Sequence, residues 1–174
     1  MAKERINPVT LNRAAAYTQV VTAQGGKLVF LAGQTPIDAQ GQIVGVGDLR
    51  AQVTQVYENI GKALSAAGGS FADVVKLTAY VVNYKPDDRT VIGEVRRQYV
   101  SETDLPAHTL LGVQALAREE FLIEVDTVAV VESESVSRLP RVPRALSAAA
   151  AGTAVILTAA ALTRQLRRLL GNRR

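Results

Sequence analysis

Cysteine is absent from this chain of 174 residues, and only one histidine, His108, is present. The lack of cysteine excludes disulfide bonds, thiolate catalysis and zinc–thiolate sites. One histidine also excludes a multi-histidine metal site within a single chain. The sequence contains no P-loop, dinucleotide-binding glycine pattern, nucleophile elbow or metal-binding motif. We therefore expect no metal and no cofactor, and any chemistry must come from scattered side chains.

Positive charge is also scarce outside the C-terminal part of the chain. Residues 1–131 hold 12 Lys and Arg against 14 Asp and Glu, whereas residues 132–174 hold eight Arg against two Glu. A nucleic-acid-binding face needs clustered cations, so we expect none on the main domain. Residues 1–16 contain no apolar run that would indicate a secretory leader. Together with the lack of cysteine, this favours a cytoplasmic protein.

The composition changes sharply after residue 131. Residues 132–144 form a polar, proline-containing segment that we interpret as a linker, and residues 145–174 predict an alanine-rich apolar helix with a basic end. Residues 145–163 carry no charge, and this length is close to the roughly 20 residues needed to cross a bilayer. The arginines that follow suit an anionic lipid surface. The alternative is a helix that packs on the domain or on another tail, so its partner is expected to be a membrane or a protein.

Residues 1–131 show alternating strand and helix patterns. Gly25-Gly26 is predicted to be the hairpin turn between the first two strands. A helix that begins after Asp48 carries apolar residues at helical spacing and ends at Gly68-Gly69. A second helix begins at residue 87. The predicted fold class is α+β, with a mixed sheet and two helices on one of its faces. The predicted strands are residues 18–22, 27–33, 73–83, 108–113 and 121–131.

Two carboxylates stand in the last predicted strand. Glu124 and Asp126 are two residues apart in an otherwise apolar segment, so both side chains point to the same face of the sheet. Burying them without partners would cost free energy. Glu124 is therefore a candidate general base that orients water. The alternative is an edge strand with a solvated face, or an interfacial ion pair.

Two further places are candidates for ligand binding. His108, at the start of a strand, is either a proton or hydrogen-bond donor to a ligand or a partly exposed structural residue. Gly33, at the end of another strand, either allows close approach of a ligand to the backbone or serves a turn that needs glycine. Tyr17 is grouped with Gly33 as a candidate ligand-binding residue.

These segments, taken in order, resemble the RidA/YjgF family. The family shows a tyrosine near its N-terminus, an (S/A)-G-Q-x-P element, a long helix, a D-V-V-K-x-T strand, a P-A-R-S element and a closing I-E-I-E-A-I-A-V strand. The resemblance covers residues 17–131. The corresponding segments are Tyr17, Ala32-Gly33-Gln34-Thr35-Pro36, the helix that ends Ala66-Ala67-Gly68, Asp73-Val74-Val75-Lys76-Leu77-Thr78, Pro106-Ala107-His108-Thr109 and Ile123-Glu124-Val125-Asp126-Thr127-Val128-Ala129-Val130.

The resemblance implies a chorismate-mutase-like fold assembled as a homotrimer, with clefts between subunits for a small-molecule ligand. It also implies hydrolysis of reactive enamines and imines to ketones and ammonia. Glu124 corresponds to the glutamate that positions water, and His108 would be the second catalytic group. The residues expected to bind the substrate are Tyr17, Ala32, Gly33, Gln34 and Thr109.

One position departs from the family pattern. His108 stands where the family has an arginine that binds the substrate carboxylate, and a neutral imidazole cannot form that two-pronged contact. Arg118 is nearby in sequence. One hypothesis is therefore an enamine and imine hydrolase that is not expected to act efficiently on carboxylate-bearing imines. The other is a non-catalytic ligand-binding or regulatory trimer that is targeted by its tail. Nuclease action is the least supported, because the main domain is acidic and lacks a phosphate-binding cluster.

Overall fold

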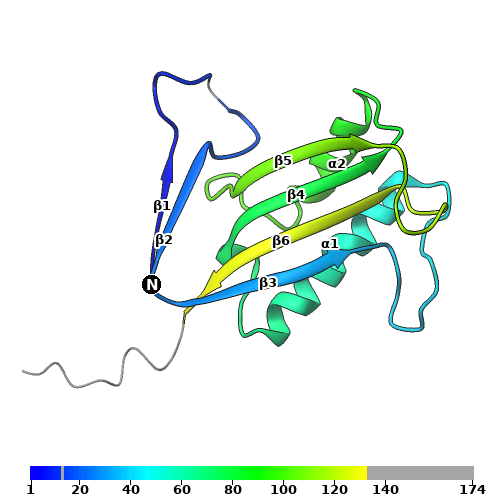
Figure 1. The fold of residues 1–174 in the computed structure, drawn as a ribbon, viewed down its shortest axis with the longest axis horizontal. Helices are drawn as coiled ribbons and strands as arrows, with labels where there is room; N and C mark the ends of the chain where they lie inside the picture. Colours follow the sequence, from blue (N-terminus) through cyan, green and yellow to red (C-terminus); the bar gives the residue numbers. More distant parts are fainter. Residues whose placement is uncertain (13, 133–174) are drawn as a thin grey trace, which may run out of the picture. The chain divides into compact units, whose positions relative to one another are not determined.

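The computed structural model describes residues 1–12 and 14–132. Its main feature is a four-stranded sheet whose strands lie in the order β3 (Lys27–Gln34), β6 (Ile123–Val131), β4 (Val74–Val82) and β5 (Ala107–Val113). Strands β4 and β5 are parallel, and the other neighbours are antiparallel. Two helices lie on the same side of this sheet (Figure 1). The predicted mixed sheet with two helices on one face is therefore confirmed. The helices are α1 (Leu49–Ala66) and α2 (Asp88–Arg96), and a short 3-10 helix, η1 (Phe71–Asp73), precedes β4.

Helix α1 begins and ends where the sequence predicts. The Asp48 carboxylate accepts a hydrogen bond from the Ala51 backbone N–H at 3.1 Å, which caps the first turn. Gly68, with φ of +82°, turns the chain away after the helix. The apolar stripe of α1 is fully buried against the sheet and forms the centre of the core: Val53, Val56, Ile60 and Leu64.

The sheet has one apolar face and one polar face, because successive side chains of a strand point to opposite sides. On β4, Leu77 and Ala79 point into the core, whereas Tyr80 lies on the opposite, open face. On β6, Glu124 pairs with Tyr80, and Asp126 pairs with Thr78. The prediction that the two carboxylates share a face is confirmed. The alternative of an edge strand is wrong, because β6 lies between β3 and β4.

The N-terminal part differs from the sequence prediction. Gly25 and Gly26 have positive φ values of +74° and +90°, but they do not form a hairpin between the flanking strands. Instead, β2 (Val20–Gln24) pairs with β1 (Ala2–Ile6), a strand that the sequence did not predict, and β3 pairs with β6. Strand β1 is short and carries three charged residues in five, so its apolar pattern is too weak to detect.

The β1–β2 hairpin is anchored beside the start of β5. The Arg5 guanidinium lies 2.6 Å from the Asp104 carboxylate, and the Thr18 backbone N–H donates to the Pro106 carbonyl at 3.1 Å. The Thr18 hydroxyl donates to the Leu105 carbonyl at 2.6 Å. These contacts bring residues 14–17, which immediately precede Thr18, close to the first residues of β5.

Within the described residues, no helix has the length and apolar character to cross a membrane. The predicted linker beyond Glu132 and the predicted helix at residues 145–174, with its membrane or protein partner, lie outside the described residues.

Candidate functional site

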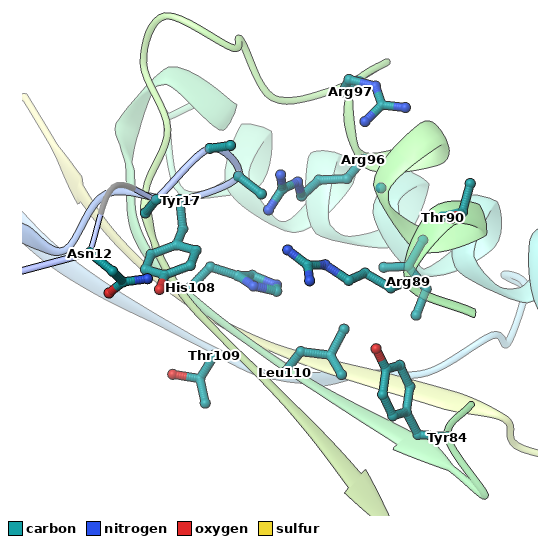
Figure 2. Close-up of a pocket in the computed structure, with 15 residues that line it drawn as sticks. Asn12, Tyr17, Tyr84, Arg89, Thr90, Arg96, Arg97, His108, Thr109 and Leu110 are labelled. Carbon is teal, nitrogen blue, oxygen red and sulfur yellow. The ribbon is translucent and has the colours of Figure 1, made fainter. Parts of the chain in front are cut away.

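A pocket of about 950 Å³ lies between the N-terminal segment, α2 and β5. Residues 14–17 form one wall, α2 forms a second wall, and the first residues of β5 form the floor (Figure 2). Its volume is within the range that small-molecule sites usually have. Three of the predicted site residues, Tyr17, His108 and Thr109, line it.

The charged groups of this pocket come mainly from α2 and its C-terminal end. Arg89, Arg96 and Arg97 line the pocket, and no Asp or Glu is among the described lining residues. Figure 2 shows the side chains of Arg89 and Arg96 extending from the helix toward His108. Arg97 is exposed and lies 3.7 Å from the Glu102 carboxylate. The pocket is therefore cationic, which favours an anionic ligand.

Arg96 is unusual among these arginines because it is buried. Only 6% of its surface is exposed, and its Nε has no hydrogen-bond partner among the described residues. Burial lowers the pKa of the guanidinium, although arginine keeps its proton at neutral pH. The hydroxyl of Tyr57, on α1, is also buried without a hydrogen-bond partner in the described part of the chain, and burial raises its pKa.

His108 is a neutral imidazole in this setting. Burial, followed by the positive charges of Arg96 and Lys76, lowers its pKa to about 4. Its Nε2 is buried and has no hydrogen-bond partner among the described residues. At neutral pH the side chain can donate or accept a hydrogen bond, but it carries no charge. The positive charge of the pocket therefore comes from the arginines.

The second group of predicted residues lies on the open face of the sheet. Glu124 reaches over Gly33, where an added Cβ would lie only 1.9 Å from its Oε1. Gly33 does not have a positive φ, so close approach, and not a turn, is the reason for glycine here. Gln34 donates from Nε2 to the Ala32 carbonyl at 2.9 Å, which places both predicted residues beside Gly33.

The environment of Glu124 makes it a stronger base than an ordinary carboxylate. Burial, followed by the negative charge of Asp126, raises its pKa. Asp126 accepts a hydrogen bond at 2.9 Å from the hydroxyl of Tyr80, whereas no hydrogen bond engages the Glu124 carboxylate among the described residues. Lys76 donates to the hydroxyl of Thr109 on the same face. In the described part of the chain, no group of three or more His, Asp or Glu is placed to share a metal ion.

One chain does not bring His108 and Glu124 together. His108 pairs with Leu77, whose side chain points toward the helices, whereas Glu124 pairs with Tyr80, whose side chain lies on the open face. The two predicted catalytic groups therefore lie on opposite faces of the same sheet. A site that uses both requires two copies of the chain.

The arginines of the pocket were missed by the sequence reasoning. Arg89 and Arg96 are seven residues apart, which places them on the same face of a helix, and this spacing was an available signal. Arg118, the cation noted nearest to His108 in the sequence, lies instead over the ring of Phe121, at 5.7 Å from the ring centre. It is not among the residues that line the pocket.

Known proteins are similar to this chain in sequence. The family model described as Endoribonuclease L-PSP matches residues 8–131. A RutC family protein of Pyrococcus horikoshii is 39% identical over 117 residues, which cover 67% of this chain and 87% of that protein. The 3-aminoacrylate deaminase RutC of Acinetobacter baylyi is 33% identical over 110 residues, which cover 63% of this chain and 84% of that protein.

Solved structures give the same result. The Rid family protein YyfB of Yersinia pestis is 35% identical and superposes with a TM-score of 0.69, over 75% of this chain and all of that one. E. coli TdcF, solved with bound serine, is 28% identical with a TM-score of 0.53, over 63% of this chain and 84% of that one. The predicted chorismate-mutase-like α+β fold is confirmed. The chain belongs to the Endoribonuclease L-PSP family, which is the RidA/YjgF family that its motifs resemble.

Proposed function

We propose that this protein is a RidA-like hydrolase that converts small reactive enamines or imines to ketones and ammonia. A relative that is 33% identical is named 3-aminoacrylate deaminase, which supports this class of reaction. The observation that carries the proposal is the Glu124 carboxylate, which lies against Gly33 on an interior strand and has a raised pKa. A carboxylate in this state is suited to take a proton from water.

In the proposed reaction, Glu124 removes a proton from a water molecule as the water oxygen attacks the imine carbon. The imine nitrogen takes up this proton, which gives a neutral carbinolamine. The Glu124 carboxylate then removes the proton of the carbinolamine hydroxyl and passes it to the nitrogen, and the C–N bond breaks as the C=O bond forms. One water is consumed, its oxygen becomes the ketone oxygen, and the nitrogen leaves as ammonia. His108, which is neutral, contributes a hydrogen bond to the ligand and no charge.

We propose that the reaction takes place between subunits of a homotrimer. Because His108 and Glu124 lie on opposite faces of one sheet, the pocket of one subunit must meet the open face of another. Tyr17 would then contact the ligand from the pocket, and Thr109, Ala32, Gly33 and Gln34 would contact it from the open face of the other subunit. Two exposed apolar side chains on the open face support a contact there: Leu28, 56% exposed, and Phe30, 72% exposed.

The proposal is tested with imines generated in solution by an amino-acid oxidase or a dehydratase, with ammonia and ketone release as the readout. We expect the full chain to accelerate release, and we expect Glu124→Gln to lose about 100-fold or more of this acceleration, as loss of a general base does. Glu119→Gln, at an exposed position in the preceding loop, is the matched control. Equal rates for the wild type and Glu124→Gln would disprove the proposal.

The second candidate is a trimer that binds a small ligand without turnover and is targeted by its tail. The neutral His108, in the place of an arginine, favours it, and the relative TdcF was solved with bound serine. Binding of a carboxylate without ammonia release would favour this function. A chain truncated after Glu132 that distributes in cell fractions as the full chain does would argue against targeting by the tail.

A further inference from the structure

The geometry points to Arg96 as the residue that binds the carboxylate of a small ligand, in the pocket between α2 and β5, in place of the arginine that is absent at position 108. This inference deepens the proposed function and rests on it for the kind of ligand. Arg96 would allow the pocket to recognise carboxylate-bearing imines, although His108 cannot form the two-pronged contact with a carboxylate.

The first argument is the burial of an unmatched charge. Only 6% of the surface of Arg96 is exposed. Among the described residues, no hydrogen bond or ion pair engages its side chain. A buried guanidinium without a counter-charge costs free energy that folding must offset. Such costs are commonly retained where a ligand supplies the missing partner. A carboxylate fits, because its two oxygens match two N–H groups of the guanidinium.

The second argument is the distribution of charge around Arg96. Arg89, on the same face of α2, is exposed at the pocket and has no ion pair among the described residues. The Glu102 carboxylate pairs with Arg97 at 3.7 Å. Its negative charge also acts on Arg96 as a minor effect, but among the described residues it forms no ion pair with Arg96. With no described Asp or Glu in the lining, the pocket contains no internal counter-ion.

The third argument is the position of Arg96 relative to the predicted ligand-binding groups. Arg96 extends from the helix toward His108, and both line the pocket with Tyr17 (Figure 2). The buried Nε2 of His108 has no hydrogen-bond partner within residues 1–12 and 14–132 and is available for a hydrogen bond with the same ligand. In this arrangement the helix supplies the charge, and the strand supplies a neutral hydrogen-bonding group.

The experiment measures binding of 2-oxobutanoate, a ketone with a carboxylate, to the full chain by calorimetry or ligand-observed NMR. The uncharged ketone 2-butanone is the comparison. We expect Arg96→Met to weaken 2-oxobutanoate binding by about 10- to 100-fold, as loss of a charge-assisted hydrogen bond does. Arg96→Lys should recover part of the affinity, because it keeps the charge but loses the two-pronged contact. Arg118→Gln, outside the pocket, should bind as the wild type does.

Several results would overturn the inference. They are unchanged 2-oxobutanoate binding by Arg96→Met, equal binding of 2-butanone and 2-oxobutanoate by the wild type, or no binding of 2-oxobutanoate at all. Thermal unfolding of each variant with and without 2-oxobutanoate separates loss of the site from loss of the fold. Arg96-dependent binding without imine hydrolysis would support the inference while disproving the proposed function. If Arg96→Met and Arg96→Lys both hydrolyse carboxylated imines at the wild-type rate, the proposed function is supported and the inference about Arg96 is disproved.

Discussion

The imidazole of His108 and the guanidinium of Arg96 show how burial changes the chemistry of single residues. The sequence identifies His108 as the only histidine and as a departure from the family pattern. It does not reveal that the side chain lies under α2 with its pKa lowered to about 4. A charge that is absent from position 108 is present on the helix that covers this position, and only the packing of α2 on β5 makes that visible.

The lowered pKa of His108 predicts a stability change with pH. Between about pH 6.5 and pH 4 the unfolded chain binds a proton on this imidazole that the folded chain does not. The contribution of the neutral His108 imidazole to the free energy of unfolding is therefore complete above pH 6.5, and it is lost as the pH falls toward 4. The loss is at most about 3 kcal/mol, from 1.36 kcal/mol for each pKa unit.

This prediction is checked by urea unfolding of the wild type and His108→Asn at several pH values. The wild type should lose more free energy of unfolding than the variant between pH 7 and pH 4, because only the wild type has the imidazole. The other titrating groups are present in both proteins, so their effects cancel in the comparison. Parallel curves for the two proteins would contradict it. Since the chain has a single histidine, one imidazole NMR signal reports the pKa directly.

At the scale of secondary-structure elements, the contact between β3 and β6 is the feature that positions Glu124. A register shift between Leu31 and Gln34 on β3 brings Gly33 beneath the Glu124 carboxylate of β6. The alternating pattern of β6 predicted the face of this carboxylate correctly. The irregularity in β3 could not be predicted, because it depends on a strand that lies about 90 residues later in the chain.

The substitution Gly33→Ala tests this contact. The new Cβ would overlap the end of the flexible Glu124 side chain, which can move aside, so we expect the free energy of unfolding to change by no more than about 1 kcal/mol. Imine hydrolysis should fall strongly, because the carboxylate is displaced. Combined with Glu124→Ala, Gly33→Ala should have no further effect on the rate. Additive losses in the double variant would show that Gly33 acts independently of Glu124.

At the scale of the whole molecule, the two candidate groups on opposite faces make assembly the central question. Strand β3 is at one edge of the sheet, and its exposed Leu28 and Phe30 lie on the face that carries Glu124. Exposed apolar side chains beside polar groups commonly mark contacts with other chains. The proposed trimer would cover this face and bring a second pocket to it.

We predict that the full chain has a mass in solution near three times its 18.6 kDa, measured by light scattering. Phe30→Glu should lower this mass and reduce imine hydrolysis together, because a buried charge would oppose the contact. Val9→Glu is the matched control, since Val9 is a fully exposed apolar residue on the β1–β2 loop. A monomeric wild type that still hydrolyses imines would contradict the intersubunit site.

The sequence by itself determined the α+β class, the apolar stripe of α1, the shared face of Glu124 and Asp126, and the family, because these depend on local periodicity and on motifs in order. Only the tertiary structure decided that β2 pairs with β1, that His108 and Glu124 face opposite sides, and that Arg96 joins the pocket. These features depend on contacts between residues far apart in the chain. Local patterns carry no information about which distant strand or helix will supply the partner.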